Sequence, residues 1–279
     1  MNIDLKKMAA FGVAGNFTGH LEQAGEALDF TNVRTKEAKA PKALFPTYIT
    51  SESSKVPSFL KVFPFSPDVI KFPKGEEKIQ IEPECGIIFD IKYADGLVKE
   101  LKPVCFGASN DCSIRKEGCR KISEKKNWGP CSKGFAEDVI ALDSFDEKSF
   151  INDYKISSFM LRDGVLNEYG EDSFIRDYNY VYGILTEWII DRLNNQKDEG
   201  PAEDLGSYLK ECDGIRQIFV SIGATRYTDY GEHNFLHDGD EAIVVLYPSV
   251  KFTTDEIKEM IMSGTSDKSV SILRQKVIQ

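Results

Sequence analysis

The chain has 279 residues, 41% hydrophobic and 29% charged, a composition typical of a globular protein with a buried core and unlike disordered or fibrous chains. Its formal net charge of -10 offers no basic face to phosphates, so we expect it to bind neither nucleic acid nor an anionic membrane. No run approaches the roughly 18 apolar residues of a membrane span, and the apolar stretch 8–14 is too short for a signal peptide. These features predict a cytoplasmic protein.

Six cysteines are present, four of them between positions 105 and 131. None belongs to a Cys-x-x-Cys pair, and the spacings match no familiar zinc module, so we expect free, reduced thiols. The alternative is a zinc-organised interaction module, which would require a metal bound by thiolates. The six are Cys85, Cys105, Cys112, Cys119, Cys131 and Cys212.

The first elements expected along the chain are a buried strand over 8–14, which ends at Gly15, and a helix-like stretch over 20–28. Residues 30–58 are rich in Lys, Pro, Thr and Ser, which indicates a long surface connection. A short strand at 43–45 lies within that connection.

The middle of the chain is rich in β-branched and aromatic residues and predicts strands over 78–91 and 97–106. Residues 113–134 carry many Lys and Arg with Gly and Pro, which favours a loop with a short helix. A hairpin is expected over 159–166, because Asp163-Gly164 supplies the positive φ that a tight turn needs.

The clearest predicted helix spans 173–195, where apolar residues recur at three- and four-residue spacing. Strands follow over 218–222 and 241–247. Thr253-x-x-Glu256 is a capping box that opens a helix ending at Gly264. Because strands outnumber long helices, the predicted class is mainly β with peripheral helices (α+β), and no composition shift divides residues 1–279 into separate domains.

The tripeptide Glu82-Pro83-Glu84 is the most informative motif. Residues two apart on a strand point to the same face, so both carboxylates would project side by side from an apolar strand. A bound cation would relieve their repulsion. The alternative is a strand end at the solvent edge, with Pro83 marking the edge and both acids hydrated.

A second motif, Asn110-Asp111, follows an apolar strand and could add a third oxygen ligand. Three carboxylates without paired His or Cys suit a hard cation such as Mg²⁺, Mn²⁺ or Ca²⁺. The alternative is an Asx-turn, in which either side chain caps the backbone.

His20 ends the third motif, Gly15-Asn16-Phe17-Thr18-Gly19-His20, directly after the first strand. An imidazole at such a turn could serve as a general base near neutral pH. The alternative is a histidine at the start of a surface helix.

The order of motifs GNFTGH, LF, IEPECGIIFD, SNDCSIRK, SKGF, SIGAT and DGD resembles that of the fumarylacetoacetate hydrolase family, from about residue 11 to 247. The resemblance implies a mixed β-roll or sandwich, a homodimer, and Mg²⁺- or Mn²⁺-dependent chemistry. Members of that family cleave, decarboxylate, hydrate or isomerise 2-oxo acids and β-diketo acids.

The resemblance also assigns roles to individual residues. It gives Glu82, Glu84 and Asp111 as metal ligands, His20 as the catalytic histidine, and Lys133 as a lysine of the active site. Candidate substrate contacts are Asn16, Arg115 and Thr225.

Some positions depart from the family pattern. Gln23 stands where many relatives have a catalytic Glu, so Glu22 or Glu26 would have to take that role, and Ala224 replaces a Thr, with Thr225 displaced by one residue. Two hypotheses follow. The first is a metal-dependent hydrolase or lyase that acts on a small 2-oxo acid or β-diketo acid through an enolate-like intermediate, and the alternative is a non-catalytic ligand-binding protein that retains the fold and the metal site.

Overall fold

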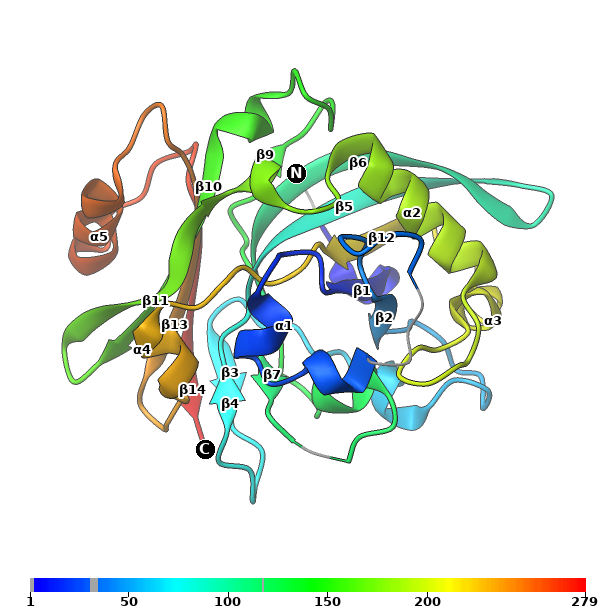
Figure 1. The fold of residues 1–279 in the computed structure, drawn as a ribbon, viewed down its shortest axis with the longest axis horizontal. Helices are drawn as coiled ribbons and strands as arrows, with labels where there is room; N and C mark the ends of the chain where they lie inside the picture. The colour runs from blue at the N-terminus through cyan, green and yellow to red at the C-terminus, as the bar shows by residue number, and fades with distance from the viewer. Residues whose placement is uncertain (1–2, 31–34, 117) are drawn as a thin grey trace.

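The computed structural model describes residues 3–30, 35–116 and 118–279, and two β-sheets form most of it (Figure 1). The strands of the first sheet run in the order β2 (Ala43–Tyr48), β1 (Ala9–Ala14), β12 (Gln217–Ser221), β5 (Pro83–Ala94), β6 (Leu97–Asn110), β8 (Gly134–Phe135), and β9 (Ile140–Ala141) also pairs with β6. The second sheet has the order β11 (Val165–Phe174), β10 (Tyr154–Arg162), β13 (Glu241–Pro248), β14 (Ser271–Ile278), β3 (Val69–Lys71). A separate two-stranded ladder joins β4 (Ile79–Gln80) to β7 (Ser113–Ile114).

Each large sheet combines antiparallel pairs with one parallel pair. In the first sheet β1 runs parallel to β12, and in the second β14 runs parallel to β3. Strand β12, from late in the chain, therefore lies between β1 and β5, which come from its first third. This arrangement brings the loop after β12 to the start of β5.

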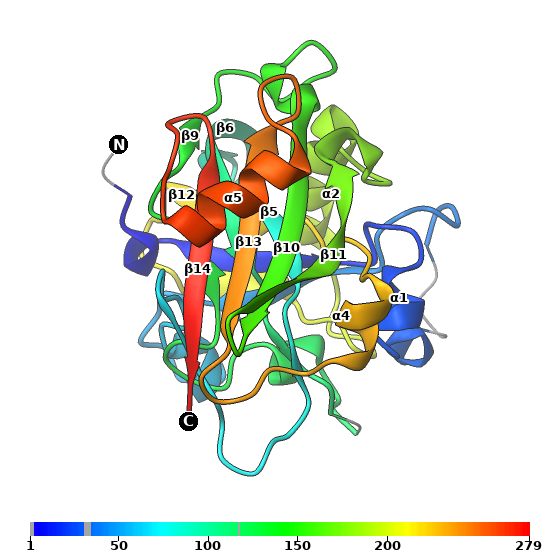
Figure 2. The same ribbon diagram turned by 90° about the vertical axis from the view of Figure 1, so that its left-hand side faces the viewer.

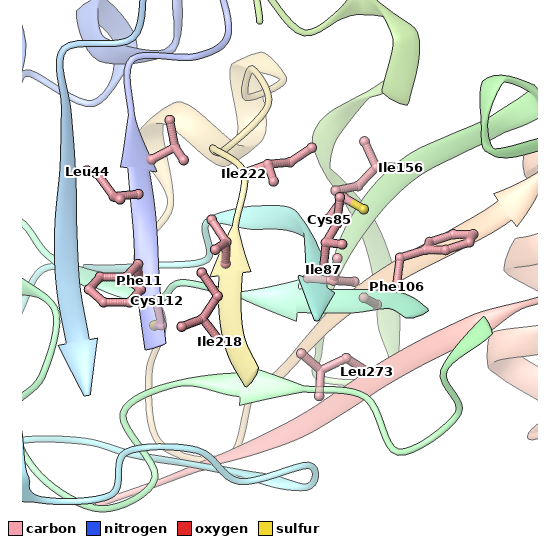
Figure 3. Packing of buried hydrophobic residues seen from close by; sticks show 14 of the residues in the cluster. Phe11, Leu44, Cys85, Ile87, Phe106, Cys112, Ile156, Ile218, Ile222 and Leu273 are labelled. Atoms are coloured by element: carbon pink, nitrogen blue, oxygen red, sulfur yellow. The ribbon is translucent and has the colours of Figure 1, made fainter. Parts of the chain in front are cut away.

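The main hydrophobic core lies between the two sheets. Ile87 and Phe106 of the first sheet share it with Ile156 and Leu273 of the second (Figure 3). All four side chains are fully buried, and burial of each aliphatic or aromatic side chain is worth about 1.5–3 kcal/mol. The core therefore fixes how the two sheets face each other, and with them the strand ends that carry the site.

The helices cover the outside of the sheets. Helix α2 (Tyr182–Asn195) packs on β6 and β2 with α3 (Leu205–Lys210) beside it, and α5 (Thr254–Ser263) lies across the second sheet (Figures 1 and 2). The short helices are α1 (His20–Gln23) and α4 (Asp229–His233), with 3-10 turns η1 (Leu5–Lys7), η2 (Ala27–Phe30), η3 (Ser58–Lys61), η4 (Ile122–Lys125), η5 (Phe150–Asp153) and η6 (Ile175–Asp177). Among the described residues, no helix is long and apolar enough to cross a bilayer.

The predicted class, mainly β with peripheral helices, is confirmed, and so are the hairpin at Asp163-Gly164 and the capping box of Thr253 and Glu256. The helix predicted over 173–195 begins only at Tyr182, because Ser173 and the residue after it still pair with β10.

Two other expectations near the N-terminus need correction. The connection predicted over 30–58 contains β2, whose six residues are all buried, although residues 31–34 lie outside the described part. The helix expected over 20–28 is a single turn, α1, followed by η2.

Candidate metal centre and its surroundings

Three buried carboxylates converge where β5 begins and β6 ends. Glu82 directly precedes β5, Glu84 is its second residue, and Asp111 follows the last residue of β6. The pairing of Pro83 with Asn110 brings these strand ends together, and Asp111 N donates to Glu82 O over 3.0 Å. Each carboxylate offers an oxygen within 4.8 Å of the others, a spacing that one ion can bridge.

The loop after β12 closes one side of this cluster. Gly223 N donates to Glu84 Oε2 over 2.7 Å, and Thr225 N donates to Pro83 O over 3.2 Å. Gly223 has a φ of +117°, and an added Cβ would lie 3.0 Å from Asn16 Cβ, so a side chain here would be strained. The glycine therefore allows a backbone amide to reach the Glu84 carboxylate.

Two lysine ammonium groups lie against the same carboxylates. Lys126, directly after η4, has its Nζ 2.5 Å from Glu82 Oε2 and 2.9 Å from Asp111 Oδ2. Lys133, just before β8, has its Nζ 3.1 Å from Asp111 Oδ1 and donates to the carbonyl oxygen of Cys112. Both lysines are buried, so the chain supplies its own positive charge to the cluster.

Arg115 adds a third cation and links the cluster to its neighbours. Its Nη1 lies 2.8 Å from Glu26 Oε1 and 2.9 Å from Glu82 Oε1. Its Nε donates to Gln80 Oε1 over 2.6 Å, and its Nη2 donates to Tyr227 Oη over 2.7 Å. With every guanidinium nitrogen engaged, Arg115 fixes the position of Glu82.

These contacts drive the pKa values of the two glutamates apart. Burial alone would raise the pKa of Glu82, but Lys126 and Arg115 outweigh it and hold that pKa far below its usual range. Burial raises the pKa of Glu84, and the charges of Asp111 and Glu82 raise it further. Glu82 therefore favours its ionised form, while Glu84 is shifted toward its protonated form.

His20 is buried beside the cluster, with its ring centroid 5.1 Å from that of Tyr227. Burial lowers the pKa of His20 to about 4, although the charge of Glu82 opposes the shift. The imidazole is therefore neutral near pH 7, the form that can accept a proton.

Two buried polar atoms beside the cluster, His20 Nδ1 and Thr225 Oγ1, have no hydrogen-bond partner among the described residues, whereas Glu82 Oε1 and Asp111 Oδ2 are held by ion pairs to Arg115 and Lys126. Unsatisfied buried polar atoms are costly and rare, and they are expected where an ion or ligand completes the site. An all-oxygen ligand set matches the preference of Mg²⁺, Mn²⁺ and Ca²⁺. The residues therefore fit a hard divalent cation.

The structure brings most of the predicted site residues together. The three predicted metal ligands form the cluster, Lys133 points its ammonium at Asp111, and His20, Arg115 and Thr225 line the surroundings. Their chemical roles stay predictions. The alternatives of hydrated strand-end acids and of a surface histidine are wrong, because these side chains are buried.

Glu22, one of the two predicted replacements for the missing catalytic Glu, is exposed on α1. Helix α1 is a single turn, and Gly25 at a φ of +68° turns the chain so that Glu26 points inward to Arg115. Glu26 is therefore the acid that the structure places beside the site.

Two polar side chains of the N-terminal segment hold backbone instead of facing the cluster. Asn16 donates to Tyr180 O and Ile222 O and accepts from Tyr180 N, so its predicted contact with substrate competes with three backbone bonds. Gln23 bonds both the N–H and the C=O of Tyr227. Both side chains tie this segment to the loop after β12.

The sequence analysis missed Lys126. It lies in the charged run Ile122–Trp128, where charged side chains are usually solvated. Nothing in its spacing distinguishes it from Lys125 or Lys121.

Comparisons with known proteins place this geometry in context. The model of a protein family described as "Family of unknown function (DUF5718)" matches residues 26–277. No curated protein matches the sequence.

Solved structures resemble the chain over nearly its whole length. Cg1458, solved with an inhibitor, is 14% identical with a TM-score of 0.57, and the alignment covers 99% of this chain and 78% of that one. A 2-keto-3-deoxy-D-arabinonate dehydratase complexed with magnesium and 2,5-dioxopentanoate is 12% identical, with a TM-score of 0.56 and coverage of 98% and 73%. A protein described as belonging to the fumarylacetoacetate hydrolase family, from Yersinia pestis CO92, is 13% identical, with a TM-score of 0.51 and coverage of 99% and 95%. The fold is therefore that of the fumarylacetoacetate hydrolase superfamily.

Proposed function

The chain belongs to the Family of unknown function (DUF5718), and from its site we propose that it is an enzyme that binds Mg²⁺ or Mn²⁺ and acts on a small 2-oxo acid or β-diketo acid. The observation that carries this proposal is the buried carboxylate triad, in which Glu82, Glu84 and Asp111 each offer an oxygen within 4.8 Å of the others. A bound cation would polarise the substrate oxygens and stabilise the negative charge that develops on them.

Shared fold gives independent support for this substrate class. The dehydratase that resembles this chain was solved with magnesium and a dioxo acid, which is chemistry that a triad of carboxylates can serve. The identity of 12% leaves the reaction itself, whether hydrolysis, decarboxylation, hydration or dehydration, to be measured.

Side chains around the triad then have separate proposed roles. His20 is neutral and has an unpartnered Nδ1, so it can accept a proton from water or from a carbon acid. Lys133, whose Nζ lies 3.1 Å from Asp111 Oδ1, can hold an anionic substrate oxygen, while the unpartnered hydroxyl of Thr225 can donate another hydrogen bond. Arg115 positions Glu82 through an ion pair of 2.9 Å.

The experiment is a turnover screen with oxaloacetate, acylpyruvates and hydroxydienoates in the presence of Mn²⁺, combined with a calorimetric Mn²⁺ titration. His20→Gln should lower turnover by about 100-fold or more, a typical contribution of a general base, while Mn²⁺ affinity is retained. Glu22→Gln is the matched control, because this acid is exposed on the same helix as His20 and its loss should change neither quantity.

A different outcome would favour the second function. If Mn²⁺ and oxalate bind tightly but none of the substrates turns over, the protein is a ligand-binding protein that keeps the fold and the metal site. The replacement of the expected catalytic Glu by Gln23, which bonds only backbone and Glu232, is the observation that favours this reading.

A further inference from the structure

Lys126 occupies a special position in the cluster. Its ammonium bridges two of the three proposed metal ligands, 2.5 Å from Glu82 Oε2 and 2.9 Å from Asp111 Oδ2. Within the part of the chain that the structure describes, these two carboxylates are the hydrogen-bond and ion-pair partners of its ammonium, which also lies 5.3 Å from the centroid of the Phe45 ring. The side chain is therefore held in place by the same oxygens that would hold a cation.

Lys133 provides an internal comparison. It also touches Asp111 and is equally buried, but it uses the other oxygen, Oδ1, and is anchored by the carbonyl of Cys112 and the ring of Trp128. Lys133 can therefore stay where it is when Asp111 Oδ2 takes another partner. Lys126 cannot, because an ammonium and a divalent cation would compete for the same lone pairs and repel each other at close range.

We infer that the Lys126 ammonium holds the place of the divalent cation in the metal-free protein, and that cation binding expels it from Glu82 and Asp111. This inference rests on the proposed cation site. It makes Lys126 a positioning residue that sets the threshold concentration for cation binding, because the cation-competent state exists only when the lysine has moved away.

A cavity of about 200 Å³ lies beside the segment that precedes Lys126, and its walls include Glu26, Arg120, Lys121, Ile122 and Lys125. A flexible four-carbon stem lets an ammonium change partners without moving the backbone far. After expulsion the ammonium stays near a site that takes an anionic substrate, and it can then pair with the substrate carboxylate.

The test compares Mn²⁺ affinities of the intact chain and of three variants by calorimetry. Lys126→Met should bind Mn²⁺ at least about 10-fold more tightly than the unaltered protein, because the competing ammonium is gone. Lys133→Met is the matched control, since it removes the same charge from the same Asp111, and it should change the affinity by less than about threefold if displacement matters more than charge. Lys121→Met, whose Nζ bonds Asp198 Oδ1 and two carbonyls, controls for a distant lysine.

Each outcome separates this inference from the proposed function. If the unaltered protein binds Mn²⁺ and Lys126→Met binds it no more tightly, or if Lys133→Met gains as much, the inference is overturned and the function stands. If only Lys126→Met binds Mn²⁺, the inference holds and metal-dependent activity of the unaltered protein is refuted. If no form binds Mn²⁺, both fail.

A second measurement uses the unaltered protein and does not depend on how a variant folds. In ¹⁵N–¹H spectra of lysine ammonium groups, the buried Lys126 should give a protected signal, assigned by its absence in Lys126→Met. Saturating Mg²⁺ should shift that signal or broaden it into exchange with water, while the Lys133 signal persists. A Lys126 signal unchanged by bound Mg²⁺ would overturn the inference.

Discussion

Two regions of this molecule bury carboxylates from motifs that stand out in the sequence, and the partners of these carboxylates differ between the two regions. On the second sheet, Asp240 receives Arg162 Nε on Oδ1 over 2.9 Å, and both Arg162 Nη2 and His237 N on Oδ2 over 2.6 Å. At the end of the first sheet three buried carboxylates share one site, and Glu82 Oε1 and Asp111 Oδ2 are held by ion pairs, each 2.9 Å from Arg115 Nη1 and Lys126 Nζ respectively.

The difference teaches that burial alone does not mark a functional acid. Asp240 has a structural role, because both of its carboxylate oxygens accept hydrogen bonds in good geometry. The triad instead brings three acids together beside two unpartnered polar atoms, His20 Nδ1 and Thr225 Oγ1, and native proteins retain unpartnered buried atoms where a ligand or ion completes them. Variants at the two regions should therefore give opposite results for stability and for cation affinity.

The largest effect is expected for Asp240→Asn. Removing the charge leaves Arg162 without its bidentate partner, and breaking a buried pair typically costs about 3–5 kcal/mol of unfolding free energy. Urea unfolding measures this loss, and calorimetry should show unchanged Mn²⁺ affinity. A loss of Mn²⁺ affinity without a loss of stability would reverse the contrast between the regions.

Glu203 extends the comparison to a group whose hydrogen bonding is half complete. It accepts from Ser123 of η4, while its Oε2 has no hydrogen-bond partner in the part of the chain that the structure describes. Burial raises the pKa of Glu203 to about 7, with Ser123 opposing the shift.

The pKa of Glu203 is higher in the folded protein than in the unfolded protein. Protonated Glu203 therefore stabilises the fold at pH values below the unfolded pKa, and this stabilisation is lost as pH rises through about 7. The shift corresponds to about 3 kcal/mol, so unfolding free energy should fall by roughly that amount between about pH 5 and about pH 8. Glu203→Gln, neutral at both pH values, should remove most of that fall in urea unfolding curves. An equally steep fall in the variant would contradict the assignment to Glu203.

Glu84→Gln should do the reverse of Asp240→Asn. Burial and the neighbouring carboxylates raise the pKa of Glu84 and so favour its neutral form, which Gln imitates. The melting temperature of the metal-free protein should be unchanged or higher, whereas Mn²⁺ affinity should fall by about 100-fold, the upper range for disturbing a metal site. A large drop in melting temperature with intact Mn²⁺ binding would show that the triad is structural.

The smallest effect concerns the capping box of α5, on the face of the second sheet far from the triad. Thr253→Ala removes the hydroxyl that accepts from Glu256 N, and loss of such a cap costs about 1 kcal/mol. Thermal unfolding should show this cost, and Mn²⁺ affinity should stay unchanged. Any change in Mn²⁺ affinity would mean that the two regions are coupled.

The sequence predicted those parts of the fold that local chemistry controls. The capping box, the Asp163-Gly164 turn and the apolar strands follow from side-chain preference within a few residues. The start of α2 could not be predicted. The apolar spacing from Ser173 onward favours a helix, but Ser173 pairs with Ile156 of β10, and this pairing exists only in the tertiary structure.

The site divides in the same manner. The convergence of Glu82, Glu84 and Asp111 could be predicted, because two acids alternate on one strand, the third follows the next strand, and adjacent strands bring their ends together. The positions of Lys126 and Glu26 depend on how η4 and the turn at Gly25 direct short irregular segments inward. Such segments have no periodicity from which a facing direction could be inferred.

The position of β12 between β1 and β5 has a consequence for the order of folding. Residues 9–12 pair with 218–221, so this part of the sheet closes only after most of the chain is available. Contacts between such distant residues form late, because the entropy of closing the intervening loop is lost before any contact compensates for it. The β5–β6 hairpin can present its acids early, but Gly223 reaches Glu84 only when β12 inserts. In refolding experiments, tight cation binding should therefore be gained in the last kinetic phase, after most of the secondary structure has formed.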